Sequence, residues 1–372
     1  MFQIHSIPHR LRWILPIIAV CLMGGSVTAQ EMAKKTVNEA AESAVRTAVF
    51  PSDSPDPTAI ESPDGYTYVF TTGPGIRIFR SRNLVDWESA GRVFDGIAPT
   101  WAMEKIPGAR NVWAPDITFH DGRYRLYYSI STFGSQRSVI GTATCVTLDP
   151  ASPDHGWTDE GIVLESDPRF TDYNAIDSAT FVDEDGRMYL FWGSYWTGLK
   201  GLEVDPATGK PTTYRDPAET DGLRIVASET AVARRSGSDT SLEAAYVVRR
   251  GAYYWLFTSR GSCCDGVRST YHIVVGRAEK PLGPYVGRQE RRLDEGFGTP
   301  LLESTQRWKG TGHNGVFQTT DPDGVKRDWL ILAAYDARAP QRGRLTQIRP
   351  LRFPNDADGW VETDDVFTLP AK

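Results

Sequence analysis

The sequence has 372 residues, with 41 Lys or Arg against 47 Asp or Glu, so its formal net charge is −6. This acidic balance disfavours nucleic acid and anionic membranes as partners, but it is compatible with a neutral ligand such as a sugar.

The chain begins with the pattern of an export signal. Arg10 and Arg12 precede an apolar run over 13–23, and small residues continue to Ala29. The run is shorter than the ~20 apolar residues of a membrane span, so we expect a signal peptide over 1–29, with an uncleaved anchor as the alternative. Its removal leaves 39 basic and 47 acidic residues, a net charge of −8. A secreted or periplasmic protein with no other membrane association is expected.

Residues 30–50 are rich in Ala, Glu, Lys and Thr and are interpreted as a linker. No shift in composition divides 51–372, which predicts one domain.

One pattern recurs along this domain at a spacing of about 60–70 residues. A Gly-bearing turn precedes an aromatic-rich strand and then a second strand with alternating residues. The predicted strand pairs are 66–72 with 76–81, 124–129 with 139–148, 188–193 with 201–204, 253–259 with 271–277, and 329–335 with 345–353. Helical patterns are nearly absent after residue 50.

Five repeats of a unit with about four short strands predict an all-β, five-bladed β-propeller. A sandwich or a parallel β-helix is the alternative. In a propeller the innermost strands surround a central channel. Residues at the starts of those strands therefore meet at its mouth, even when they are far apart in sequence.

Polar residues recur where those innermost strands begin. Asp56, Asp116, Asp177 and Glu243 mark the first four repeats, and His313 marks the fifth. These residues are expected at equivalent positions. A single acid there is more often a turn cap, but several acids together would repel one another unless function required them.

Two carboxylates across a channel suit the cleavage of a glycosidic bond, which needs one protonated acid and one ionised base. Glu243 lies among apolar neighbours and is the predicted general acid, since burial raises a carboxyl pKa. Asp56 lies in a more polar segment and is the predicted base, with Asp53 as an alternative. Asp177 is predicted to orient the acid and adjust its pKa.

Sugar binding is expected to use aromatic faces and a few hydrogen bonds. Trp101, Phe133 and Tyr195 are weaker aromatic candidates than Trp113 and Trp196. Asn174 and Ser194 are the candidate hydrogen-bonding residues.

The cysteines that remain after export do not form a disulfide framework. Cys263 and Cys264 are adjacent, so a bond between them would be strained, and buried thiols are the alternative. Of the remaining histidines, His120, His155 and His272 are interpreted as structural.

Several segments in this order resemble glycoside hydrolase family 43. They are Asp56-Pro57, Trp113-Ala114-Pro115-Asp116, Asn174-Ala175-Ile176-Asp177 and Glu243-Ala244. A narrower similarity to its endo-1,5-α-L-arabinanase branch rests on Gly261-Ser262-Cys263-Cys264, on 269–277, on Gly283-Pro284-Tyr285 and on Gly312-His313-Asn314. The resemblance spans about 53–360. Pro55, Ser178 and Ala245 depart from the family pattern and affect the expected subsite detail.

The resemblance implies an inverting endo-hydrolase of α-1,5-L-arabinofuranosidic bonds in arabinan, a pectin side chain. A monomer is expected. It implies Asp56 as base, Glu243 as acid and Asp177 as pKa modulator. It also implies a calcium ion with His313 as a ligand, although calcium prefers oxygen ligands. An exo-acting arabinosidase or xylosidase and a non-catalytic carbohydrate-binding propeller remain the alternatives.

Overall fold

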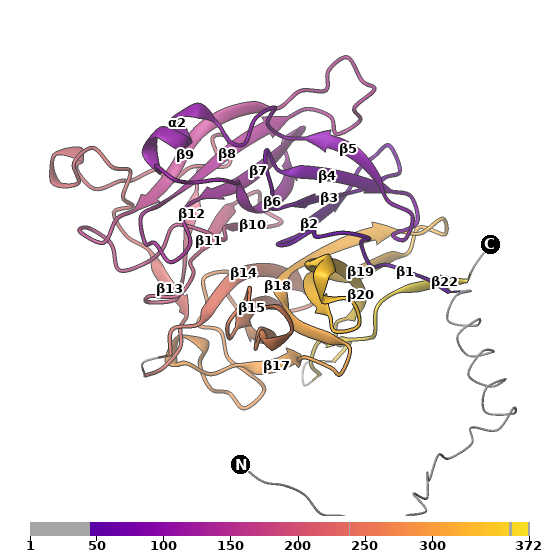
Figure 1. Cartoon of the computed structure of the whole chain (residues 1–372). Coiled ribbons are helices and arrows are strands. Elements are labelled where there is room, and N and C mark those ends of the chain that lie inside the picture. The colour runs from indigo at the N-terminus through magenta and orange to yellow at the C-terminus, as the bar shows by residue number, and fades with distance from the viewer. Residues whose placement is uncertain (1–44, 238, 357–358, 371–372) are drawn as a thin grey trace, which may run out of the picture. The chain divides into compact units, whose positions relative to one another are not determined.

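The computed structural model describes residues 45–237, 239–356 and 359–370 (Figure 1). Arg46–Pro370 form one compact unit, built mainly from five four-stranded antiparallel sheets. The sheets follow one another along the chain, and each uses four consecutive strands. They are β2–β5 (Thr58–Glu61, Thr67–Thr71, Arg77–Ser81, Glu88–Arg92), β6–β9 (Trp113–His120, Arg123–Ile130, Ser138–Cys145, Thr158–Ser166), β10–β13 (Ala179–Val182, Met188–Trp192, Leu199–Val204, Thr230–Ala233), β14–β17 (Leu242–Arg250, Tyr253–Arg260, His272–Ala278, Thr299–Leu302) and β18–β21 (Trp308–Thr320, Lys326–Asp336, Arg344–Arg352, Glu362–Thr363).

The first strands of the five sheets form a closed ring. β2 contacts β6, β6 contacts β10, β10 contacts β14, β14 contacts β18, and β18 returns to β2. The first and last sheets therefore lie side by side, as their indigo and yellow colours show in Figure 1. The predicted five-bladed propeller is confirmed. The predicted strand pairs correspond to the second and third strands of the blades.

The third blade illustrates how the local sequence sets the hairpins. β10 and β11 pair antiparallel from Ala179↔Phe191 to Val182↔Met188. Gly186 closes the turn between them with φ 81°, a conformation that costs glycine little. The Gly186 amide donates to the Asp183 carbonyl. The turn and the apolar run after it were both predicted.

The second strand of each blade is buried on both faces, because alternate side chains point to opposite neighbours. In β11, Leu190 and Trp192 pack toward the second blade, whereas Tyr189 and Phe191 pack toward the fourth. In β7, Tyr127 faces the third blade and Tyr128 faces the first. Five hydrophobic cores therefore lie between successive blades and hold the ring together.

The start of the described chain joins the last blade. β1 (Val45–Thr47) pairs with β22 (Thr368–Pro370), and Ala48 and Phe50 are buried against the fifth and first blades. The linker predicted over 30–50 therefore does not extend over 45–50, because these apolar side chains gain by burial. Residues 30–44 and the predicted signal peptide lie outside the described residues.

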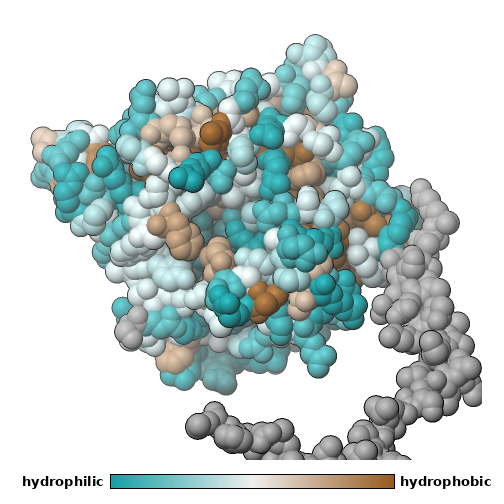
Figure 2. All heavy atoms as spheres, viewed as in Figure 1, coloured by the Kyte–Doolittle hydropathy of each residue, from teal (hydrophilic) through white to brown (hydrophobic). Residues whose placement is uncertain are grey.

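Helices are few in the described ranges. α2 (Thr100–Lys105) is accompanied by four 3₁₀ turns, η1–η4 (Pro217–Glu219, Gly266–Arg268, Leu293–Glu295, Pro340–Arg342). Among the described residues, no helix has the length and hydrophobicity needed to cross a membrane. The face in view in Figure 2 is mostly hydrophilic, with hydrophobic side chains in small separate groups.

Candidate active site

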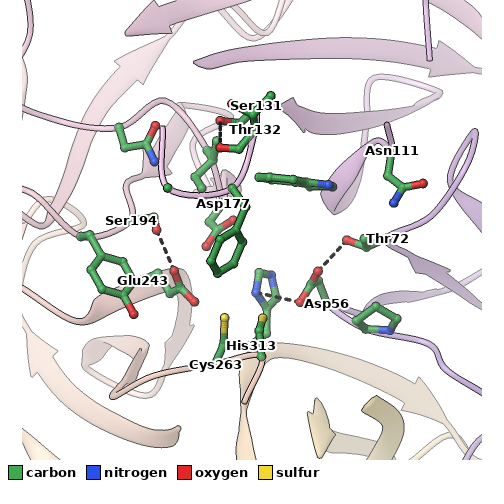
Figure 3. Close-up of a pocket in the computed structure, with 18 of the residues that line it drawn as sticks. Asp56, Thr72, Asn111, Ser131, Thr132, Asp177, Ser194, Glu243, Cys263 and His313 are labelled. Carbon is green, nitrogen blue, oxygen red and sulfur yellow. Dashed lines mark hydrogen bonds and ion pairs between the residues drawn. The ribbon is translucent and has the colours of Figure 1, made fainter. Parts of the chain in front are cut away.

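A cavity of about 1040 Å³ opens where the innermost strands of the propeller begin. Every blade contributes to its wall. The five contributions include Asp56, Trp113, Asp177, Glu243 and His313, in blade order. Asp56, Asp177, Glu243 and His313 point into the same space in Figure 3. Residues separated by more than 250 positions thus share one site.

One backbone feature recurs where each of the five inner strands borders the cavity, before or within its first three residues in four blades and at the sixth residue of β18. A residue with positive φ stands there in each blade, and the five are Asp56 (53°), Ala114 (43°), Asp177 (56°), Ala244 (56°) and His313 (52°). Such a conformation costs a non-glycine residue about 1–3 kcal/mol, so the surrounding fold must impose it. Register shifts in the second, fourth and fifth blades accompany it. The resulting bulge turns side chains out of the ladder.

Hydroxyl groups of neighbouring blades hold three of these residues in place. In each case the backbone amide donates to a hydroxyl at or near the end of the preceding blade's second strand. The pairs are Ala114 with Thr72 (2.8 Å), Asp177 with Ser129 (3.0 Å) and His313 with Ser259 (2.9 Å).

The expectation that all five polar residues occupy equivalent positions is wrong in two blades. Glu243 precedes the positive-φ residue Ala244, and Asp116 follows Ala114 by two residues. Asp116 is buried outside the cavity, and its carboxylate accepts two bonds from Thr180, both 2.8 Å. Burial raises the pKa of Asp116 to about 7. The bulge in each strand shifts the acid relative to the positive-φ residue. Counting residues from the apolar run in the sequence does not reveal this shift.

Asp56 is surrounded by groups that favour its ionised form. Its Oδ1 accepts a bond from Arg344 at 2.8 Å and lies 3.4 Å from His313 Nδ1, and its Oδ2 accepts one from Thr72 at 2.6 Å. Burial raises the pKa of Asp56, but the charges of Arg344 and His313 and the hydrogen bonds outweigh it and hold the pKa below its ordinary value. A carboxylate in this state can accept a proton.

Glu243 is oriented by two hydroxyl groups. Ser194 Oγ donates to its Oε2 at 2.6 Å, and Tyr271 Oη donates to its Oε1 at 2.7 Å. Both partners are buried and come from the third and fourth blades. One carboxyl group is thereby fixed at the cavity wall, as a group that must deliver a proton to a defined atom requires.

Among the hydrogen bonds of the described residues, none holds the Asp177 carboxyl in this way, and Asp177 stands near other acids. Burial, followed by the charges of Glu243 and Asp56, raises its pKa well above the ordinary value. Two buried carboxylates close together cannot both ionise cheaply, so Asp177 retains its proton at a higher pH than a free carboxyl group would.

The predicted substrate-binding residues all line the cavity: Trp113, Asn174, Ser194 and Trp196. Ser194 is already bonded to Glu243, and Asn174 Oδ1 accepts a bond from Ser138 at 2.6 Å. Among the weaker aromatic candidates, Phe133 and Tyr195 also line the cavity, and Phe133 is 83% exposed. Trp101 lies elsewhere and donates to Asp159.

Three residues of the site were missed by the sequence analysis: Thr72, Tyr271 and Arg344. Only the starts of the innermost strands were searched, whereas Thr72 follows the second strand of its blade, and Tyr271 and Arg344 stand at the start of third strands. Arg344 follows Gly343 at the start of β20, and no local pattern marks it. Asp53, the alternative base, lines the cavity, and its Oδ1 accepts the backbone amide of Arg344 at 2.8 Å.

His313 has few companions that could share a metal ion. Among the residues that the structure describes, no group of three or more His, Cys, Asp or Glu side chains could hold one. The Nδ1 atom of His313 also faces Asp56. Calcium takes six to eight oxygen ligands, so the protein groups present fit it poorly, and water would have to supply most of its ligands.

Comparison with known proteins agrees with this geometry. Residues 45–361 match the family model of glycosyl hydrolases family 43. An extracellular exo-α-(1→5)-L-arabinofuranosidase of Cellvibrio japonicus is 38% identical over 314 residues, 84% of this chain and 87% of that protein. An extracellular endo-α-(1→5)-L-arabinanase of Bacillus subtilis is 34% identical over 286 residues, which are 76% of this chain and 80% of that protein. The structure of a Cellvibrio cellulosa α-L-arabinanase with arabinohexaose aligns with a TM-score of 0.73 at 36% identity. The alignment covers 84% of this chain and 96% of that one.

Proposed function

The chain belongs to glycosyl hydrolases family 43 and is a glycoside hydrolase, and we propose that it hydrolyses α-1,5-linked arabinofuranosides of arabinan. The observation that carries the proposal is the meeting of Asp56, Asp177 and Glu243 in one cavity. Relatives named as arabinan hydrolases support the substrate.

The proposed reaction inverts the sugar carbon. Asp56, kept ionised by Arg344, takes a proton from a water molecule that attacks this carbon. Glu243, oriented by Ser194 and Tyr271, gives its proton to the departing oxygen. The attacking water requires room between the two carboxyl groups, ~6.5–9.5 Å in inverting enzymes.

An endo mode of attack is the first candidate, since the Bacillus and Aspergillus relatives carry endo names. An exo mode is the second, because the Cellvibrio japonicus relative is named as exo-acting at 38% identity. Early products from debranched arabinan distinguish the modes. Endo attack gives a ladder of oligosaccharides and a rapid fall in viscosity, whereas exo attack gives one short product from the start.

We also propose export, by cleavage near residue 29, to the cell exterior or periplasm, where arabinan from pectin would be met by a monomeric enzyme. The extracellular names of two relatives support this. Mass spectrometry of the secreted protein and light scattering test the cleavage site and the monomer.

Asp177→Asn should lower turnover and move the alkaline limb of the pH–rate profile to lower pH. Asn carries no charge that could repel the Glu243 carboxylate, so the general acid of the variant should lose its proton at a lower pH. An unchanged pH–rate profile would exclude Asp177 from the mechanism.

The same variant should be more stable than the wild type at neutral pH. When the folded-state pKa of a carboxyl is raised, the protein loses stability as the pH rises from 3.8, the ordinary pKa of the group, through its raised pKa. Asn cannot ionise, so that loss should vanish from urea unfolding measured across this pH range. Equal slopes in both proteins would contradict the assignment.

Trp196→Ala should raise KM about 2- to 12-fold, corresponding to ~0.5–1.5 kcal/mol of stacking, with a smaller effect on kcat. Trp196 lines the cavity and is partly exposed, so a sugar face can reach it. Steady-state kinetics on arabino-oligosaccharides provide the measurement, and Trp101→Ala, outside the cavity, is the matched control. An unchanged KM would exclude Trp196 as a platform.

Calcium remains a proposal, with His313 as its protein ligand and water as the remainder. Removal of calcium by EDTA should then lower the unfolding midpoint. If calcium had been present at 100 times its Kd, the free energy of unfolding should fall by about 2.7 kcal/mol. Calcium should restore the midpoint in the wild type but not in His313→Ala. A midpoint indifferent to EDTA, with no calcium in elemental analysis, would refute the site.

A further inference from the structure

The cavity wall contains two thiols that the proposed reaction does not use. Cys263 and Cys264 follow β15, and both line the cavity, where Figure 3 shows the Cys263 sulfur directed into the open space. Neither forms a disulfide; Cys264 is exposed and Cys263 is partly so. The third described cysteine, Cys145, is buried outside the cavity.

The backbone places these two side chains together. Neighbouring residues of an extended strand point to opposite sides, but Cys264 has φ 67° and breaks that alternation. Each thiol is the largest influence on the pKa of the other, which is raised for Cys263 and lowered for Cys264, so the two sulfur atoms lie near each other. One small centre can therefore contact both sulfur atoms.

Hydrogen bonds hold the loop that carries the thiols. The Ser262 amide donates to Thr270 Oγ1 at 3.0 Å, and Ser269 Oγ donates to the Ser262 carbonyl at 2.7 Å. Gly261 allows the close approach, since a Cβ there would lie 2.5 Å from the Thr270 carbonyl oxygen. The pair is thus fixed against the fourth blade before any ligand arrives, which lowers the entropy cost of binding.

Charges near the thiols are mixed. The guanidinium of Arg344 acts on Cys264 and favours its thiolate, whereas the carboxylates of Asp56 and Glu243 oppose it. Thiolate sulfur is a soft ligand that prefers soft metal and metalloid centres over hard cations such as calcium.

We propose that Cys263 and Cys264 form a chelating site for thiophilic centres, namely trivalent arsenicals and soft cations such as Hg²⁺, and that occupancy blocks the cavity. Only the blocking rests on the proposed function. Binding itself depends on the two sulfur atoms alone.

The chemistry can be written for phenylarsine oxide, in which arsenic is trivalent. Two As–S bonds form, the As–O bond breaks, and the oxygen leaves as water with both thiol protons. Arsenic keeps its oxidation state and its phenyl carbon, so two sulfur atoms complete its three bonds and no third protein ligand is needed.

Intact-mass measurement tests the site. The full mature protein is reduced, freed of reductant, and treated with phenylarsine oxide in the presence of excess glutathione, a monothiol that removes singly bonded arsenic. One arsenical should be retained per chain and released by 2,3-dimercaptopropanol. Arabinan hydrolysis should fall with uptake and return on release.

Matched serine variants locate the adduct. Cys263→Ser and Cys264→Ser should each retain none, whereas Cys145→Ser should retain one. An arabino-oligosaccharide in the cavity should slow the uptake of phenylarsine oxide by the wild type. This measurement needs no variant. Retention by either vicinal variant, or no retention by the reduced wild type, overturns the site. Full hydrolysis by the arsenical-bound protein overturns the blocking, and a protein that never hydrolyses arabinan refutes the proposed function but leaves the mass test valid.

Discussion

Replacing Glu243 with Gln should lower arabinan hydrolysis about 10²- to 10⁴-fold, the usual contribution of a general acid. Gln keeps the shape of the side chain and one oxygen for Ser194 or Tyr271, but it has no proton to give to the departing sugar. Reducing-sugar release from debranched arabinan measures the loss.

The leaving group tests the role of Glu243. The nitrophenolate group of a nitrophenyl arabinoside departs as a stable anion and needs little protonation, so Glu243→Gln should lose far less activity on this substrate than on arabinan. Glu104→Gln, on the exposed face of α2, serves as the matched control and should behave as wild type. Equal losses on both substrates would show that Glu243 does not act as the acid.

Asp56→Asn should also lower turnover by about 10²–10⁴, but to the same extent on both substrates, because activation of water is needed whichever group leaves. Asn retains an oxygen for Arg344 and Thr72, yet it cannot take a proton. The variant also leaves the partly buried guanidinium of Arg344 without a counter-charge, so the unfolding midpoint of the protein should fall.

Asp53→Asn separates the two candidate bases. Asp53 lines the same cavity, but its carboxylate binds the backbone of Arg344 rather than its guanidinium. Asp53→Asn should keep turnover within about tenfold of the wild type, below the range expected for a lost base. A larger loss in Asp53→Asn than in Asp56→Asn would reverse the assignment.

The architecture was predictable because its signals are local. A glycine such as Gly186 closes each hairpin at positive φ, and runs such as β11 are buried on both faces. Turn chemistry and two-residue alternation are readable within ten residues. The number of repeats then determined the number of blades. The carboxylates Asp56, Asp177 and Glu243 were also found in this way, since each stands beside an apolar strand.

The tertiary structure alone decided the environment of those carboxylates. Arg344 reaches Asp56 across 288 positions, and Tyr271, just before β16 of the same blade, reaches Glu243. Bulges offset Glu243 and Asp116 by one and two residues from the positions that simple counting assigns. Such contacts depend on how the ring closes rather than on neighbouring residues. The local sequence therefore specifies the fold and the three acids. The packing of the blades sets the hydrogen-bond partners of Asp56 and Glu243 and the burial that raises the pKa of Asp177.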